Sequence, residues 1–233
     1  VETVTDRSIP EKLFETMNEL AKNATFRLLL QEAIPTTMPS WMHLCQEALT
    51  DSVFQRMELL LSIVHNSVVR CEANKKLWME TNGFAEALIQ TLRAILAQEM
   101  DDEAKRVGCL VCRNVTALCT FDDFSCNIQS GHSHAPLLEE AGAAELIHVF
   151  LQRVETADAV SALRALAIQD DIVRSMLPIG VLDTAKHILQ ESADSDVLTA
   201  VLGLFRNVSA NDDIKTTLCR IDVLSYLVQA MER

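Results

Sequence analysis

The chain has 233 residues, of which 49% are hydrophobic, and its formal net charge is −13. An acidic surface repels phosphate backbones and anionic lipid headgroups, so the charge argues against nucleic-acid binding and membrane-surface binding. The sequence contains no signal peptide and no run of about 18 apolar residues, so we expect neither secretion nor membrane spanning.

The composition predicts an all-α chain. Only six Gly and five Pro are present, helix formers such as Leu, Ala and Glu are plentiful, and hairpin signals are missing. The seven cysteines are an odd number and fall within helical patterns. This usage indicates free thiols in a reducing compartment, either the cytosol or the nucleus.

A short motif built around an asparagine recurs along the chain. Its copies are His65-Asn66-Ser67-Val68, Arg113-Asn114-Val115-Thr116-Ala117, Arg164-Ala165-Leu166-Ala167 and Arg206-Asn207-Val208-Ser209-Ala210. When the asparagine, or Ala165, is taken as position zero, successive copies are 48, 51 and 42 residues apart. Self-similarity at a period of about 40–47 residues predicts stacked helical units, and it favours a binding scaffold over an enzyme.

Helices and breaks alternate in the same order in each predicted unit. Near the N-terminus, residues 17–21 are a candidate for a further motif helix, with a break at Ala33-Ile34-Pro35. Later breaks stand at Thr81-Asn82-Gly83, Ala141-Gly142, Ile179-Gly180 and Ile221-Asp222. The apolar-periodic helices that follow these breaks are expected at Phe84–Leu96, Ala143–Leu151, Val181–Leu189 and Val223–Met231. Each unit is therefore predicted as a short helix, a second helix and a long third helix that carries the motif.

The units combine into one predicted solenoid. We expect units at about 24–71, 72–120, 122–169 and 170–210, with partial units at 1–23 and 211–233. Because the chain begins at Val1 and stops within an amphipathic run, we interpret it as a fragment of a longer array. The Asp pairs at 122–123, 170–171 and 212–213 stand where helices begin, so we expect their carboxylates to cap the free amides there.

The motif helix has two different sides. Positions −5, −2 and +1 lie on one side, and eleven of these twelve residues are apolar or Cys, which predicts the buried side. Positions −4, −1, 0 and +3 lie on the other side, which carries a recurring cation and amide. Cys109 and Cys112 occupy −5 and −2, where other units have Leu, Val or Phe, so we interpret this CxxC as core thiols and not as a zinc site.

These residues resemble armadillo repeats. The resemblance implies a right-handed superhelix whose third helices line a concave groove, and it implies protein–protein interaction. Residues of about 120–231 resemble one member of the family more closely. The segments that carry this likeness are Thr120-Phe121-Asp122-Asp123, Gly131-His132-Ser133-His134, Leu163-Arg164-Ala165-Leu166-Ala167 and Asn211-Asp212-Asp213-Ile214-Lys215.

One feature departs from the family pattern. Nuclear-import receptors of this fold pair the groove asparagine with a Trp at position −4. Position −4 here is occupied by Ser62, Leu110, Ser161 and Gly203, and the two tryptophans lie outside the motif helices. The sequence therefore does not support recognition of a basic import signal.

Three sets of residues are candidates for contacting a partner. Asn66, Asn114 and Asn207 could hold the backbone of an extended peptide, because an amide donates and accepts together; alternatively they bond neighbouring helices. Arg113, Arg164 and Arg206 form a ladder that could bind an acidic partner or a C-terminal carboxylate; alternatively they pair with carboxylates of adjacent units. His132 and His134 lie in an insertion that could contact a partner, hold a metal or simply pack.

We therefore expect a non-enzymatic scaffold that binds a protein or peptide along the third-helix groove, with no cofactor and no resident metal. One alternative is an assembly module that self-associates through the array end, where Val223, Leu227 and Met231 form an apolar face. The other alternative is a metal-responsive loop at His132 and His134, although further ligands are not evident.

Overall fold

The computed structural model describes residues 8–50, 54–120, 134–220 and 222–231. Within these ranges the chain forms fourteen α-helices and no β-strand. In chain order they are α1 (Ser8–Ala21), α2 (Ala24–Thr50), α3 (Phe54–Val68), α4 (Glu72–Glu80), α5 (Phe84–Leu96), α6 (Asp102–Cys119), α7 (Ala135–Glu140), α8 (Ala143–Arg153), α9 (Ala157–Leu166), α10 (Asp170–Met176), α11 (Val181–Glu191), α12 (Ser195–Val208), α13 (Asp212–Arg220) and α14 (Val223–Met231).

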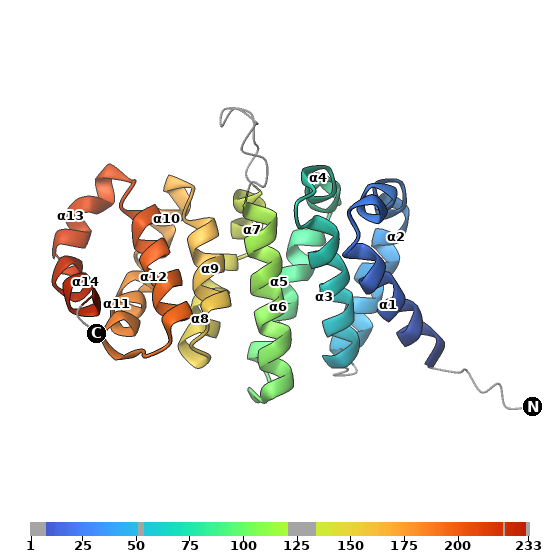
Figure 1. Ribbon diagram of the computed structural model, residues 1–233, viewed down its shortest axis with the longest axis horizontal. Coiled ribbons are helices and arrows are strands. Elements are labelled where there is room, and N and C mark those ends of the chain that lie inside the picture. The colour runs from blue at the N-terminus through green and yellow to red at the C-terminus, as the bar shows by residue number, and fades with distance from the viewer. Residues whose placement is uncertain (1–7, 51–53, 121–133, 221, 232–233) are drawn as a thin grey trace, which may run out of the picture.

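The helices form an elongated array in which, from α3 onward, every third helix occupies the same layer (Figure 1). The layer contains α1, α3, α6, α9 and α12, and each of these helices packs against the next one. Three complete sets of a short first helix, a second helix and a third helix follow one another: α4–α6, α7–α9 and α10–α12. Before them, α1 packs on α3 as a third helix does, and after them α13 and α14 supply a first and a second helix. None of the described helices is both long enough and apolar enough to span a bilayer.

A left-handed residue precedes each second helix after the first unit. Gly83, Gly142 and Gly180 have φ of 84°, 87° and 84° and stand directly before α5, α8 and α11. Glycine adopts this backbone conformation without a Cβ clash, which lets the chain reverse within one residue. Asp222 occupies the same place before α14 with φ of 56°. The predicted breaks at these four places are confirmed.

The predicted break at Ala33-Ile34-Pro35 is wrong, because α2 continues through it as one helix of 27 residues. Among the described side chains of α2, the buried ones recur at helical spacing on both sides of Pro35: Leu30, Ile34, Trp41, Cys45 and Ala48. This single apolar stripe packs on α3, α4 and α5, and tertiary burial of the stripe outweighs the backbone hydrogen bond that a proline removes.

Single aspartates cap the third helices α6 and α12. The described Asp pairs stand elsewhere, at the short helices that follow the motif. Asp101 accepts from the Ala104 amide at 2.8 Å, and Asp194 accepts from the Asp196 and Val197 amides at 2.8 and 3.1 Å. The prediction that Asp170-Asp171 cap a helix is wrong: Gln169 holds the N-cap of α10, and both aspartates lie in its first turn. There they still favour the positive end of the helix dipole. The pair at 122–123 lies outside the described residues.

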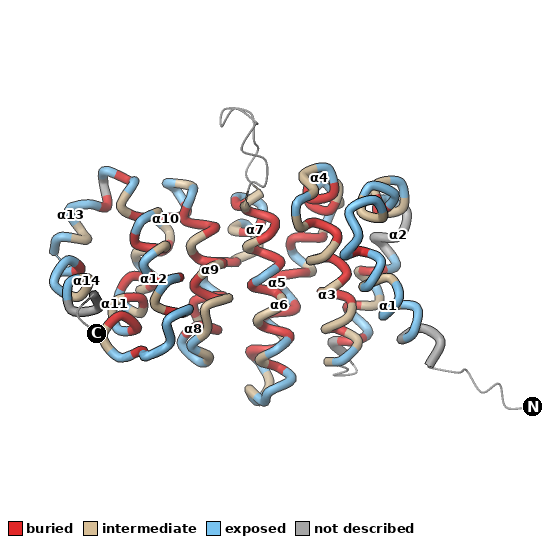
Figure 2. Tube along the Cα trace, viewed as in Figure 1, coloured by how far each residue is buried: buried red, intermediate tan, exposed pale blue. Residues whose placement is uncertain are grey.

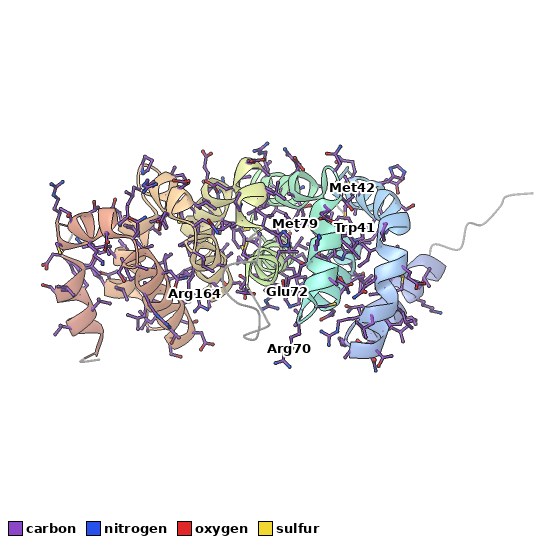
Figure 3. All side chains as sticks on the ribbon, turned by 90° about the horizontal axis from the view of Figure 1, so that it is seen from above. Trp41, Met42, Arg70, Glu72, Met79 and Arg164 are labelled. Atoms are coloured by element: carbon purple, nitrogen blue, oxygen red, sulfur yellow. The ribbon has the colours of Figure 1, made fainter. Side chains whose placement is uncertain are left out.

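One hydrophobic core runs through the array, and it thins toward both ends (Figure 2). In the N-terminal part, the rings of Trp41, Trp78 and Phe84 pack together with centroids 5.3, 5.5 and 5.0 Å apart. Trp41 and Met79, labelled in Figure 3, are both buried in this core. Both tryptophans therefore stabilise the join between α2 and the second unit, and neither lies in the third-helix layer.

Two buried polar residues of α4 form hydrogen bonds far along the chain, Lys75 within its own unit and Asn74 with the two preceding helices. Lys75 has an exposed fraction of 0%, and its Nζ donates to the Thr120 carbonyl at 2.5 Å and to Glu72 Oε1 at 2.7 Å. Thr120 is the C-cap of α6, so the ammonium group lies where the helix dipole is negative. The Asn74 Nδ2 donates to the carbonyls of Arg27 and Ser67, both at 2.9 Å. The sequence pattern did not reveal these joints.

Candidate functional site

Two hollows lie along the layer of third helices. The first has a volume of about 360 Å³ and is formed by α3, α6 and α9 with the ends of the turns that follow α3 and α6. Its lining residues are His65, Val69, Arg113, Thr116, Ala117, Thr120, Asp158 and Ser161. The second has a volume of about 430 Å³ and is formed by α1, α3 and α6, with Glu15, Asn18, Gln55, Glu58, Leu59, Ser62, Glu103 and Arg106 around it. Most of these side chains are polar, unlike the core behind them.

The two-sided reading of the motif helix is largely confirmed. Ten of the twelve residues at positions −5, −2 and +1 are buried. The exceptions are Cys109, which is half-buried, and Leu202, which is 42% exposed. Leu202 lines a hollow between α12, α13 and α14, and the described chain has no third helix after α12. Burial of this position thus depends on a following helix and not on α12 itself.

The motif asparagines bond to neighbouring helices. Asn114 has an exposed fraction of 0%, and its Nδ2 donates to the carbonyls of Leu61 at 3.1 Å and Leu110 at 2.9 Å. The Asn207 Nδ2 donates to the Arg164 carbonyl at 2.9 Å. The Asn66 Nδ2 donates to Asn18 Oδ1 at 2.8 Å, which marks Asn18 in α1 as a further copy of the motif. This geometry favours the alternative that the asparagines join successive units, and in this arrangement a partner cannot reach Asn114.

Arg113 has an internal partner. Its Nε donates to Asp158 Oδ2 of α9 at 2.9 Å. The carboxylate hydrogen bond is the first cause that raises the pKa of the guanidinium, while burial opposes it. Asp158 lies in the first turn of α9, where a carboxylate also suits the helix dipole. For Arg113 the geometry therefore favours the alternative of a salt bridge between adjacent units.

Arg164 and Arg206 differ from Arg113, because neither side chain has a hydrogen-bond or ion-pair partner among the described residues. Arg164 projects from α9 and lies against α12 (Figure 3). A Cβ added to Gly203 would lie 2.6 Å from Arg164 Cδ and 2.7 Å from its Nη1. The arginine therefore occupies the space that a side chain at position −4 fills in the other units. Arg206 is exposed, one helical turn after Gly203.

His65 lines the first hollow beside Arg113. Burial is the first cause that lowers the pKa of its imidazole, and the positive charge of Arg113 is the second, while Asp158 opposes both. The Nδ1 atom is buried and has no hydrogen-bond partner among the described residues. The imidazole is therefore held neutral near neutral pH. The sequence marked His65 only as part of a weak motif copy and not as a member of a site.

The remaining candidates lie partly outside the described residues. His132 is not among them, and His134 is half-buried at the N-cap of α7. Within the described ranges, no three His, Cys, Asp or Glu side chains are grouped so as to hold a metal ion. Cys112 is fully buried in the core, and burial raises its pKa well above the usual range for a thiol. Cys109 is half-buried, with Sγ 3.6 Å from Thr156 Oγ1. The interpretation of Cys112 as a core thiol is confirmed.

Sequence reasoning missed the residues that complete the first hollow. Asp158 follows the cap residue Thr156, and nothing in the motif alignment connects it with Arg113, which precedes it by 45 residues. Thr116 and Thr120 donate their hydroxyl hydrogens to the Cys112 and Thr116 carbonyls at 3.0 and 2.9 Å. Their oxygen lone pairs remain able to accept. A comparison of position −7 between units would have been the only sequence signal for Asp158.

Comparison with solved structures identifies the class of fold. A designed armadillo repeat protein in complex with the peptide (KR)4 matches with a TM-score of 0.75 at 16% identity, over 97% of this chain and 87% of that chain. A second designed armadillo repeat protein matches with a TM-score of 0.74 at 14% identity, over 97% and 87%. An engineered protein of known crystal structure matches with a TM-score of 0.72 at 18% identity, over 97% and 86%. No protein-family model matches the sequence, and a search of curated proteins finds no significant match.

The fold is thus an all-α solenoid of three-helix armadillo repeats, as the resemblance implied.

Proposed function

We propose that this chain is a non-enzymatic scaffold that binds an extended segment of a protein partner along the layer of third helices. The observation that carries the proposal is the pair of polar hollows between successive third helices. The polar side chains that line these hollows do not bury the core. They are suited to a partner that brings its own hydrogen-bonding groups.

The chemistry of the first hollow suits a peptide main chain. Thr116 and Thr120 present oxygens that accept, Ser161 presents a hydroxyl, and Arg113 retains guanidinium hydrogens beyond the one bound to Asp158. A mixture of donors and acceptors matches the alternating N–H and C=O groups of an extended segment. The designed neighbour that holds the peptide (KR)4 supports the idea that this fold can carry a peptide.

The proposal includes several finer points. The partner is a protein or peptide, neither nucleic acid nor membrane, and no cofactor is required. The location is the cytosol or the nucleus, where the cysteines stay reduced. We also propose that residues of about 120–231 are related to armadillo repeat-containing protein 6, on the segments quoted for that part of the sequence. That relationship brings no catalytic residues with it.

Site-specific photocrosslinking tests the proposal. A photoreactive benzoyl-phenylalanine replaces Ser161 in the first hollow, or Ser62 in the second, and the matched control replaces Gln90 on the exposed side of α5. We expect crosslinks to one short segment of a partner at positions 62 and 161 and none at position 90. Crosslinking that is equal at all three positions, or confined to position 90, would refute binding along the third helices.

A second candidate function is assembly through the array end. A hollow of about 580 Å³ between α12, α13 and α14 is lined mainly by apolar residues, including the exposed Leu202 and Leu224. Val223 is 4% exposed, so the apolar face consists of Leu202 and Leu224 more than of the residues expected from the sequence. The side chain of Met231 lies outside the described residues. Light scattering should then give a mass above 25.9 kDa that falls to the monomer in Leu202→Glu; a monomer at all concentrations contradicts assembly.

A further inference from the structure

We propose that Arg164 and Arg206 form a carboxylate-binding subsite within the third-helix layer, which takes acidic residues of the bound segment. The inference rests on the proposed function, because it assigns the chemistry of the partner at one end of the same surface. Three features of α12 carry it: the residue at position −7, the residue at position −4, and the asparagine at position zero.

The first feature is a missing carboxylate. In α9, position −7 is Asp158, and it neutralises Arg113 of the preceding helix at 2.9 Å. In α12, position −7 is Ala200, which is buried and carries no charge. Arg164 stands at position −1 of α9 and contacts the following helix α12, as Arg113 stands at position −1 of α6 and contacts α9. The α9–α12 interface therefore has the arginine of the motif, but alanine stands where the α6–α9 interface has the aspartate that pairs with it.

The second feature is the place that α12 provides for Arg164. Gly203 lacks a side chain, and the aliphatic stem and Nη1 of Arg164 lie over it. The Asn207 Nδ2 also holds the Arg164 backbone carbonyl at 2.9 Å. Both the main chain and the side chain of Arg164 are thus positioned by α12. Positioning of this kind reduces the conformational entropy that a flexible arginine loses when it binds a ligand.

The third feature is the position of Arg206. Residues 203, 206 and 207 share one face of α12, because positions three and four apart on a helix are neighbours. Arg206 therefore starts beside Gly203, over which Arg164 lies, and it also borders the hollow between α12, α13 and α14. Two guanidinium groups on one face repel each other, and an anion bound between them removes that repulsion while each fork can bind a carboxylate through two hydrogen bonds.

Among the described side chains, no carboxylate forms an ion pair with Arg164 or Arg206. In α9 the carboxylate of Asp158 pairs with Arg113. In α12 the acidic residue before Arg206 is Asp196, ten residues earlier, which corresponds to about 15 Å along the helix axis. A carboxylate from a partner can therefore fill the place without displacing an internal one. The overall charge of −13 opposes the approach of an acidic segment at long range, so local geometry has to supply the selectivity.

Fluorescence anisotropy with a labelled (Glu-Ala)4 peptide tests the subsite on the whole chain. We expect binding of this probe, and we expect Arg164→Gln or Arg206→Gln to raise its Kd about tenfold, because each removes a hydrogen bond to a charged group. Arg174→Gln in α10 is the matched control, since it removes the same charge from an exposed helix outside the layer. Its Kd should stay within about twofold of the original. Absence of (Glu-Ala)4 binding, or an equal loss in Arg174→Gln, would overturn the subsite.

A second test introduces a carboxylate into α12 at the position that corresponds to Asp158 in α9. Ala200→Asp supplies at α12 the carboxylate that Asp158 supplies at α9, so it should pair with Arg164 and weaken (Glu-Ala)4 binding about as much as Arg164→Gln does. Circular dichroism checks that the variant folds. Full affinity in a folded Ala200→Asp chain overturns the register argument. If Ala200→Asp does not fold, Arg164→Gln and Arg206→Gln decide the matter, because both side chains are at the surface.

The subsite and the proposed function can fail separately. If the crosslinked partner of positions 62 and 161 binds Arg164→Gln/Arg206→Gln as well as the original chain, the scaffold function stands and the acidic subsite falls. If (Glu-Ala)4 binding depends on both arginines but no partner crosslinks to the layer, the subsite stands and the proposed function falls.

Discussion

The α6–α9 and α9–α12 interfaces begin from the same arginine position and end with different chemistry. At the first, Arg113 meets Asp158 at 2.9 Å, and a serine occupies position −4 of the next helix. At the second, Arg164 meets Ala200 and Gly203, and its guanidinium has no partner among the described residues. This difference shows that an arginine at the same position of two repeats can have two different roles. The residues that the following helix places opposite it decide whether it stabilises the array or remains available to a partner.

The largest effect we expect is on the free energy of unfolding when one methyl group is added to a helical glycine. The effect should differ between Gly108, inside the array, and Gly203, at the α9–α12 interface. A Cβ on Gly108 of α6 would lie 2.4 Å from Cε2 of Phe150, a fully buried ring that cannot move. Gly108→Ala should therefore lower the free energy of unfolding by about 1–3 kcal/mol in urea denaturation. Gly203→Ala should leave it unchanged or raise it by up to about 1 kcal/mol, because the new methyl group meets only the outer part of the Arg164 side chain, which can shift, and alanine favours the helix.

The double variant Gly108→Ala/Phe150→Leu is the control for the first of these effects. It should recover part of the lost stability, because the smaller side chain leaves room for the new methyl group. A Gly108→Ala variant that is as stable as Gly203→Ala would show that the interior of the array adjusts as easily as its surface.

The next largest effect is a difference in stability between variants of the motif asparagines Asn114 and Asn207. Asn114 is fully buried with two carbonyl acceptors, whereas Asn207 is half-buried with one. Asn114→Ala should cost about 1–2 kcal/mol of unfolding free energy, and Asn207→Ala about 0.5–1 kcal/mol. Thermal and urea unfolding of the two single variants measures this difference. Equal losses of unfolding free energy in the two variants would mean that the greater burial of Asn114 does not strengthen its hydrogen bonds relative to those of Asn207.

The Arg113–Asp158 pair should contribute less than either asparagine joint. The Arg113 side chain is 53% exposed, so solvent screens the pair, and its coupling energy should be below about 1 kcal/mol. A double-mutant cycle with Arg113→Gln and Asp158→Asn measures the coupling, and 1 M salt should reduce it. A coupling that is insensitive to salt would indicate that the pair is shielded more than its exposure implies.

The smallest effect is a pH dependence from His65 beside that pair. Burial and Arg113 lower its pKa in the folded chain, so the unfolded chain binds the proton more readily. Stability from this residue is therefore complete above about pH 6.5 and falls as the pH decreases toward the lowered pKa. NMR titration should find the pKa of His65 higher in Arg113→Gln and lower in Asp158→Asn than in the original chain. Identical values in all three would remove both charges as causes.

Much of the array could be predicted from the sequence, because its information is local and repeated. Phe84–Leu96 and Val223–Met231 were expected from apolar periodicity, and α5 and α14 have those bounds. The left-handed glycines could be located because the break must reverse the chain within one residue. The continuous α2 could not be predicted, because Pro35 signals a helix end locally, whereas burial against α1, α3, α4 and α5 stabilises the unbroken helix.

The sequence by itself determined the period, the helix type and the side of each third helix that faces the core, since these follow from composition and from spacing within one unit. Only the tertiary structure decided which arginine is neutralised, which asparagine is buried and where Arg164 lies. Those outcomes depend on a helix about 45 residues away, and the −7 and −4 positions of that helix have meaning only when the units are stacked. The recurring Arg-Asn motif therefore revealed the architecture, while the contacts between stacked units assigned its individual roles.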